Sequence, residues 1–143
     1  MMPSRGRNEK IAGGGFHHVA IRVRDFDRSV AFYSDVLGFV KKIEWGQEPG
    51  RAIMLDTGDG NYLELFERPS QPRPSEEGVL LHFALRTSDC SAALERARSA
   101  GCEVTTEPKD VVIKSAPRPT SVRLAFFKGP DGEVIELFQN EMT

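Results

Sequence analysis

The 143-residue sequence predicts an α+β fold in which two βαβββ repeats form one curved mixed sheet. Two internal matches indicate the repeat. Residues 18–22 recur as 82–86, an offset of 64 positions, and residues 59–66 recur as 131–138, an offset of 72 positions. The same succession of strand and helix patterns follows the first match in both copies. We base the fold class on this duplication, because a repeat determines how the whole chain folds.

The two repeats are expected to cover residues 16–67 and 80–139 of a single domain, 16–139. The connector between them, 68–78, contains three prolines, which are typical of an exposed loop. Residues 1–15 contain three basic side chains, lack an apolar stretch and end in three glycines. We therefore expect them to form a flexible leader and not a secretory signal.

The first repeat opens with a strand over residues 17–24, where apolar side chains occupy alternate positions. An amphipathic helix is predicted over 27–37, with Asp25 or Asp27 as its N-cap and Gly38 after its end. The three remaining strands of this repeat are predicted over 39–45, 51–56 and 61–67.

The second repeat follows the same order. Its first strand is predicted over 81–87, and its helix over 89–100 with Ser88 or Asp89 as the N-cap and Gly101 after its end. The helices of both repeats are expected to cover the outer face of the sheet. The three remaining strands of this repeat are predicted over 103–106, 122–128 and 133–139.

The two offsets differ by eight residues, so the second repeat contains additional chain. We assign the addition to an irregular run, 111–121, which contains Pro117 and Pro119. Lys114 and Arg118 in this run would form either a basic lid over the binding site or a solvated loop.

Composition and charge exclude several classes of protein. Nineteen Lys and Arg residues against twenty-one Asp and Glu residues provide no basic footprint for nucleic acid or an anionic membrane. No stretch approaches the roughly 18 apolar residues that a membrane-spanning helix needs. Cys90 and Cys102 are too few for a disulfide framework, which favours reduced thiols and a cytoplasmic location. The expected partner is a small molecule.

Four polar side chains occupy positions where the pattern predicts a core. His18 and His82 alternate with apolar residues that can pack under the helices, and Glu64 and Glu136 lie in the middle of apolar strands. An unpaired buried carboxylate is costly, so each must be neutralised, form an ion pair or bind a cation. His17 is placed on the opposite face by strand parity, and we expect it to have a structural role.

One histidine opens each repeat and one glutamate closes each repeat, all on the face away from the helices. If the repeats pair about a pseudo-twofold axis, these four side chains converge in one concave cavity. Two imidazoles and two carboxylates suit a divalent first-row metal ion, whose charge the carboxylates balance. The sequence therefore predicts a metal site in the cavity enclosed by the curved sheet. Its ligands would be His18, Glu64, His82 and Glu136, and its ion nickel or zinc, with iron, cobalt or manganese as alternatives.

Four motifs in these strands resemble those of the vicinal oxygen chelate superfamily, which groups glyoxalases, bleomycin resistance proteins and extradiol dioxygenases. They are His-Val-Ala-Ile-Arg-Val at 18–23, Asn-Tyr-Leu-Glu-Leu at 61–65, His-Phe-Ala-Leu at 82–85 and Pro-Asp-Gly-Glu-Val-Ile-Glu-Leu at 130–137. The resemblance covers residues 16–139. In glyoxalase I the matching positions are metal ligands, and the His/Glu/His/Glu set resembles that enzyme most closely.

The resemblance implies a metal-dependent lyase or isomerase that transfers a proton on a small carbonyl substrate through a metal-bound enediolate. The ion would act as a Lewis acid, while a carboxylate takes the α-proton and returns it to the adjacent carbon. Glu136 is preferred as this base, with Glu64 as its partner or its counterpart on the opposite face. Members of the superfamily commonly form homodimers, and we expect a homodimer here.

The resemblance also suggests an anionic substrate. Arg22 matches an arginine with which glyoxalase I holds a carboxylate of glutathione. Arg68 stands where glyoxalase I has an asparagine that binds glutathione, so a different acidic substrate is expected. Tyr62, Phe66 and Phe138 would either line the pocket wall or pack in the core, and Trp45 would either line the entrance or pack in the core.

Three alternatives stay open. An enzyme resembling methylmalonyl-CoA epimerase would use the same metal and base, although these epimerases usually have Gln at the position of Glu64. Extradiol dioxygenases typically have two His and one Glu as ligands and usually a longer chain. A metal-free drug-binding protein of the bleomycin resistance type has generally lost the ligands, all four of which this chain keeps.

Overall fold

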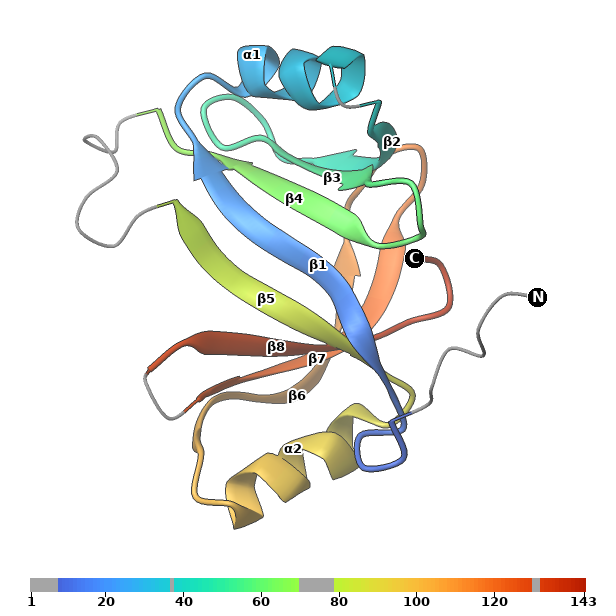
Figure 1. Cartoon of the computed structure of the whole chain (residues 1–143), viewed down its shortest axis with the longest axis vertical. Helices are drawn as coiled ribbons and strands as arrows, with labels where there is room; N and C mark the ends of the chain where they lie inside the picture. Colours follow the sequence, from blue (N-terminus) through green and yellow to red (C-terminus); the bar gives the residue numbers. More distant parts are fainter. Residues whose placement is uncertain (1–7, 37, 70–78, 130–131) are drawn as a thin grey trace.

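The computed structural model contains one curved, mixed sheet of eight strands with a helix at each end (Figure 1). The strand order is β2-β3-β4-β1-β5-β8-β7-β6. The structure describes residues 8–36, 38–69, 79–129 and 132–143. The elements of the first half are β1 (Gly13–Val23), α1 (Phe26–Ala31), a π-helical turn (Phe32–Val36), β2 (Val40–Trp45), β3 (Ala52–Asp56) and β4 (Tyr62–Glu67). Those of the second half are β5 (Leu80–Thr87), α2 (Cys90–Ser99), β6 (Glu103–Ile113), β7 (Thr120–Lys128) and β8 (Val134–Gln139).

The two halves have the same topology. β1 pairs in parallel with β4, and β5 pairs in parallel with β8. The antiparallel pairing of β1 with β5 joins the halves in the middle of the sheet, as Figure 1 shows. The α+β fold with two βαβββ repeats and a curved mixed sheet, predicted from the sequence, is therefore confirmed.

Aspartates cap both helices. The Asp25 side chain accepts a hydrogen bond from the backbone N–H of Arg28 at 3.1 Å, and that of Asp89 accepts from Ala92 at 3.0 Å. Each bond satisfies one of the N–H groups that a helix leaves free at its start. The helix predicted over 27–37 ends early as α1, and the chain continues as the π-helical turn; residue 37 lies outside the described residues. Among the described residues, no helix has the length and apolar character required to cross a membrane.

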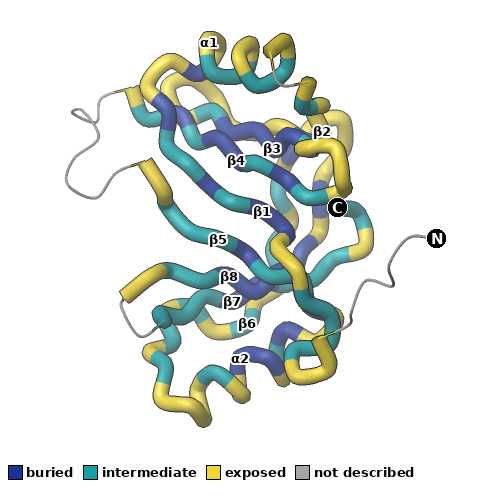
Figure 2. The backbone as a smooth tube through the Cα atoms, in the orientation of Figure 1, coloured by how far each residue is buried: buried dark blue, intermediate teal, exposed yellow. Residues whose placement is uncertain are grey.

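Each helix covers an apolar patch on the outer face of its own half. Leu65, Ile53 and Leu55 form the patch under α1, and Leu94 of α2 packs with Leu137 of β8. All five are at most 1% exposed, and Figure 2 shows the buried positions along the central strands. Side chains alternate between the two faces of a sheet along each strand. The residues between those that pack under the helices therefore point to the inner face.

The first strand begins earlier than predicted. β1 begins at Gly13, within the range 1–15 that was expected to be a leader. The backbone of Gly13 exchanges hydrogen bonds of 2.9 and 3.1 Å with Asn8, and the Ala12 carbonyl accepts from Ser88 at 2.7 Å. These backbone bonds, which the composition of the segment does not reveal, anchor residues 8–15. Residues 1–7, and residues 70–78 of the predicted connector, lie outside the described residues.

The irregular run predicted over 111–121 is confirmed only at 114–119 and is wrong at both ends. β6 continues to Ile113 and β7 begins at Thr120, so the additional residues lengthen a two-stranded ribbon. Val111, Ile113 and Val122 continue the alternation and pack in an inner apolar cluster, which the prolines in the turn obscured. At the tip, Ala116 exchanges backbone hydrogen bonds of 2.9 and 2.6 Å with Glu44 of β2. The ribbon thus reaches the opposite edge of the sheet (Figure 1).

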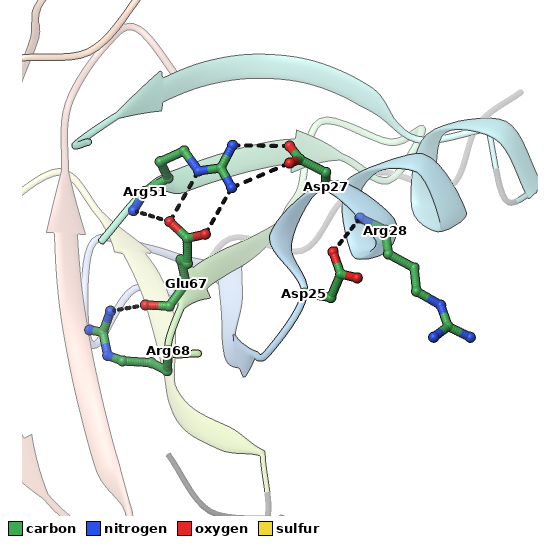
Figure 3. Close-up of polar contacts among 6 residues, drawn as sticks. All are labelled: Asp25, Asp27, Arg28, Arg51, Glu67 and Arg68. Carbon is green, nitrogen blue, oxygen red and sulfur yellow. Dashed lines mark hydrogen bonds and ion pairs between the residues drawn. The ribbon is translucent and has the colours of Figure 1, made fainter. Parts of the chain in front are cut away.

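Arg51 connects the first turn of α1 to the end of β4 (Figure 3). Its guanidinium donates to the Glu67 carboxylate at 2.8 and 3.0 Å and to Asp27 at 3.0 Å. The backbone N–H of Arg51 also donates to Glu67 at 3.0 Å. The Glu67 side chain is 5% exposed and that of Asp27 is 80% exposed, so water screens the second contact far more than the first.

We expect Glu67→Gln to weaken the dependence of stability on acid pH. Hydrogen bonds from Arg51 hold the pKa of Glu67 below its usual value. A lowered folded-state pKa adds stability above the unfolded value of about 4.3, and this stability is lost as the pH falls through the folded value. Thermal melts between about pH 7 and pH 3 should therefore decline less steeply for Glu67→Gln than for wild type, with Asp27→Asn as the exposed control. Equal declines in Glu67→Gln and wild type would contradict this.

Candidate metal centre

The junction between the two halves brings His18 and His82 together. In the antiparallel register of β1 and β5, His18 lies opposite Ala84, and Ala20 lies opposite His82. The arrangement is symmetrical, because each histidine lies opposite the alanine that follows the other histidine by two positions. Both imidazoles consequently reach the same point from two neighbouring strands.

The two glutamates occupy equivalent positions on the outer partners of these strands. Glu64 of β4 lies beside Ala20 of β1, and Glu136 of β8 lies beside Ala84 of β5. Both halves have the same register. The offset between the glutamate and the histidine on the paired strand is therefore the same in each repeat. The structure thus brings together, within one chain, the four side chains that the sequence singled out.

The ring nitrogens and carboxylate oxygens of these side chains lie close to one another. His18 Nε2 lies 2.9 Å from Glu136 Oε1, 3.1 Å from His82 Nε2 and 3.3 Å from Glu64 Oε1. His82 Nε2 lies 3.2 Å from Glu136 Oε1 and 3.6 Å from Glu64 Oε1. The donor atoms of His18, His82 and Glu136 all fall within 4.8 Å of one another, as the ligands of a single ion must.

Burial differs among the four. The side chain of His18 is 1% exposed, those of both glutamates are 6% exposed, and that of His82 is 14% exposed. Burial lowers the pKa of His82, but the hydrogen bond to Glu136 and the nearby carboxylate of Glu64 outweigh it and raise the pKa to about 9. Burial raises the pKa of Glu136, yet hydrogen bonds from His18 and His82 bring it below its usual value. The cluster therefore favours positive charge beside its carboxylates, and His82 is its most accessible member.

One atom of the cluster has an unmet requirement. Glu64 Oε1 is buried and accepts no hydrogen bond of good geometry, although His18 Nε2 and His82 Nε2 are 3.3 and 3.6 Å away. A buried carboxylate oxygen without a partner is costly. Two carboxylates and two imidazoles with one orphaned oxygen are a donor set that a divalent cation would satisfy, so these residues fit the ion that the sequence predicted.

Ala20 and Ala84 lie between the clustered histidines and glutamates and are fully buried. We expect Ala84→Leu to destabilise the fold by about 1–3 kcal/mol, because the larger side chain overfills a packed interior. Ala84 packs with Val122, Leu124 and Phe138 in the inner cluster, which offers little room. Denaturant unfolding measures the loss. An exposed site on α2, Ala92→Leu, is the control, and equal stability of the two variants would contradict the close packing.

His17 is a residue of the site that the parity argument missed. The register shifts between Phe16 and His18, and this bulge turns His17 toward the inner aromatic residues. Its ring stacks on Phe138 at 4.1 Å and lies 5.1 Å from Tyr62, and its Nδ1 lies 2.8 Å from Nδ1 of His18. The expectation that His17 points to the opposite face is therefore wrong. The glycines that precede it were a signal of strand irregularity.

Burial is the main cause that lowers the pKa of His17, and the charges of His18 and Arg86 lower it further, to about 2. The ring is therefore neutral at physiological pH.

Tyr62 and Phe138, expected to line the substrate pocket, form the wall around His17. They are 6% and 4% exposed, so they offer little surface to a ligand. Phe126 was not singled out from the sequence, although its ring lies 5.6 Å from that of His82, the more accessible of the two clustered histidines. Because Phe126 lies on β7, its approach to His82 depends on how the strands are ordered in the sheet.

Arg22 lies near the C-terminal end of β1, and Arg68 directly follows β4. The Arg68 guanidinium donates to the Glu67 carbonyl at 2.8 Å and lies 5.3 Å from the ring centre of Phe66, on the strand face shared with Glu64. Arg22 contacts the Leu80 carbonyl at 3.4 Å. Trp45, expected at the entrance, lies 6.1 Å from Phe66 in an edge-to-face arrangement.

Comparison with known proteins identifies one family. A family model described as Glyoxalase/Bleomycin resistance protein/Dioxygenase superfamily matches residues 15–137. The uncharacterized protein YaeR of Escherichia coli is 36% identical over 86% of this chain and 94% of its own length. A probable lactoylglutathione lyase of Vibrio cholerae is 31% identical over 88% of this chain and 91% of its own length.

The fold is also similar to that of solved structures. A methylmalonyl-CoA epimerase from Mycobacterium tuberculosis superposes with a TM-score of 0.72 over 96% of this chain and 94% of its own, at 22% identity. A methylmalonyl-CoA epimerase in complex with methylmalonyl-CoA and NH4+ superposes with a TM-score of 0.66 over 89% of this chain and 94% of its own, at 25% identity. The family match over nearly all of the described chain and the shared fold lead to one conclusion: the chain belongs to the Glyoxalase/Bleomycin resistance protein/Dioxygenase superfamily.

Proposed function

We propose that the protein is a metal-dependent lyase or isomerase of glyoxalase type that transfers a proton between adjacent carbons of a small carbonyl compound. The observation that carries the proposal is the convergence of two imidazoles and two carboxylates in one buried cluster within one chain. Relatives named lactoylglutathione lyase at about 30% identity support it. In a metal-free binding protein, the buried Oε1 atom of Glu64 would stay without a partner.

His18, Glu64, His82 and Glu136 would hold the ion. A divalent metal bound there supplies Lewis-acid polarisation of the substrate oxygens. Glu136 takes the proton from the carbon next to the carbonyl and returns it to the neighbouring carbon. Glu64 comes from the other repeat and provides the equivalent carboxylate on the opposite side. The substrate enters beside His82, whose side chain is the most exposed of the four.

The surroundings of His82 and Glu64 favour an anionic substrate with an apolar part. Phe126 beside His82, and Phe66 beside Trp45, present aromatic surface near the cluster. Arg68 stacks on Phe66, and a guanidinium held in this way is suited to bind a carboxylate or phosphate group. In glyoxalase I an asparagine occupies the position of Arg68, which favours an acidic group other than the glutathione carboxylates.

A second candidate is the epimerisation of an acyl thioester. It is favoured by the extent of the similarity to methylmalonyl-CoA epimerases, one of which superposes on 96% of this chain. The proton transfer would use the same carboxylates. Glu64, where those epimerases usually have Gln, favours the glyoxalase type instead.

Proton exchange with solvent tests both candidates. The protein, loaded with Ni²⁺ or Zn²⁺ in D₂O, is incubated separately with the hemithioacetal of methylglyoxal and glutathione, with α-hydroxycarbonyl acids, and with methylmalonyl-CoA. We expect deuterium to enter at the carbon next to the carbonyl of one compound, and a chelator to stop this. Reaction of the thioester alone would select the second candidate. The absence of exchange in all three classes would contradict the proposal.

A further inference from the structure

His17 is the buried polar residue next to the cluster that the proposed function does not use. It is 1% exposed, and both of its ring nitrogens contact polar groups. Nδ1 lies 2.8 Å from Nδ1 of His18, and Nε2 lies 2.5 Å from Oγ1 of Thr143. A neutral imidazole donates from one nitrogen and accepts at the other, so these two contacts determine where the ring proton lies.

The direction of the hydrogen bonds follows from Thr143. Its backbone N–H, which can only donate, points to Oδ1 of Asn140 at 3.4 Å, and this identifies that atom as the acceptor oxygen. The Thr143 hydroxyl donates its single hydrogen to the same oxygen at 3.1 Å. The hydroxyl oxygen is then left to accept, and His17 must donate from Nε2.

A neutral His17 with its proton on Nε2 accepts at Nδ1. His18 consequently donates its Nδ1–H to His17, which leaves Nε2, the ring nitrogen that faces Glu136 and His82, as the atom of His18 that would bind the ion. The opposite direction, with His17 as the donor, would leave the proton of a neutral His18 on Nε2. That nitrogen could not then bind a cation.

We infer that His17 is a positioning residue: it accepts the Nδ1–H of His18 and so makes Nε2 the nitrogen of His18 that would bind the ion. The inference rests on the proposed function, because the tautomer matters only if His18 binds the ion. Histidine ligands commonly donate their second N–H to a carboxylate, a carbonyl or water. Here a second imidazole is the acceptor, and the bulge in β1 makes it available from the adjacent residue.

Long-range ¹H–¹⁵N correlation spectra of the zinc-loaded wild-type protein test the tautomers directly. We expect His17 to be protonated on Nε2 and His18 on Nδ1. A His17 ring that carries its proton on Nδ1 would overturn the inference. The measurement needs no substitution, so it decides the question even if variants at this buried position fail to fold.

Zinc affinity provides the second test. His17→Phe keeps a ring that can stack on Phe138 but removes the acceptor, whereas His17→Gln keeps an acceptor. Competition with a chromophoric chelator should show zinc affinity about 10–100-fold weaker in His17→Phe than in wild type, with partial recovery in His17→Gln. Equal affinity in His17→Phe and wild type would overturn the positioning role alone. Failure of the wild-type protein to bind zinc would instead overturn the metal site, and the inference with it.

Discussion

Glu136→Gln is expected to slow the exchange of the substrate α-proton by about 10²–10⁴-fold, which is the usual contribution of a positioned general base. The substitution keeps the size of the side chain and one oxygen that can bind the ion, but it removes the basic carboxylate. Glu136 Oε1 lies 3.2 Å from Nε2 of His82, on the accessible side of the cluster. Exchange is measured by NMR in D₂O at saturating metal, so that weaker metal binding does not contribute.

Glu64→Gln is the matched control for this substitution. Both carboxylates are 6% exposed and lie beside both histidines, so the two variants differ chiefly in which repeat loses its base. We expect a smaller effect at Glu64. Loss of exchange in Glu64→Gln with full exchange in Glu136→Gln would transfer the role of base to Glu64. Full exchange in both variants would contradict proton transfer by these carboxylates.

His82→Ala is expected to reduce metal affinity by about 10²–10³-fold, if the binding free energy of about 10–16 kcal/mol typical of four-ligand zinc sites is shared evenly among the ligands. His82 is preferred to His18 for this test, because its partly exposed side chain can be removed with less disturbance of packing. The wild-type fold should gain about 4 kcal/mol at a thousandfold excess of metal over Kd, and the variant should gain far less.

Thermal melts with and without added Zn²⁺ measure this gain. Glu141→Gln changes an exposed carboxylate outside the cluster and should respond to zinc as wild type does. A His82→Ala protein that zinc stabilises as much as wild type would show that the ion binds elsewhere on the chain.

The sequence predicts the fold and the four clustered residues well because the same strand and helix patterns, each with its histidine and glutamate, occur in both repeats. A single histidine in a strand, or a single glutamate in an apolar run, has an ordinary structural explanation. The recurrence of His18 as His82 and of Glu64 as Glu136 removes that explanation, and the equivalent registers of the two halves show why. Where both copies obey the same alternation, the face of each residue follows from counting.

The sequence predicts least where the two copies differ. His17 has no histidine as its counterpart in the second repeat, and a one-residue bulge reverses the face that counting assigns to it. The β6–β7 ribbon extends through residues assigned to an irregular run, because its alternation resumes on either side of two prolines. The contact of Phe126 with His82 joins strands that are distant in the chain, and no local pattern reports it.

Anomalous X-ray scattering from crystals of the Ni²⁺-loaded protein, collected at the nickel edge, tests the central claim most directly. We predict one strong peak per chain, at a bonding distance of about 2.0–2.2 Å from Nε2 of His18 and His82 and from carboxylate oxygens of Glu64 and Glu136. All four ligands should belong to the same chain. A peak remote from these side chains, or no peak in fully loaded crystals, would contradict the assignment of this cluster as a metal centre.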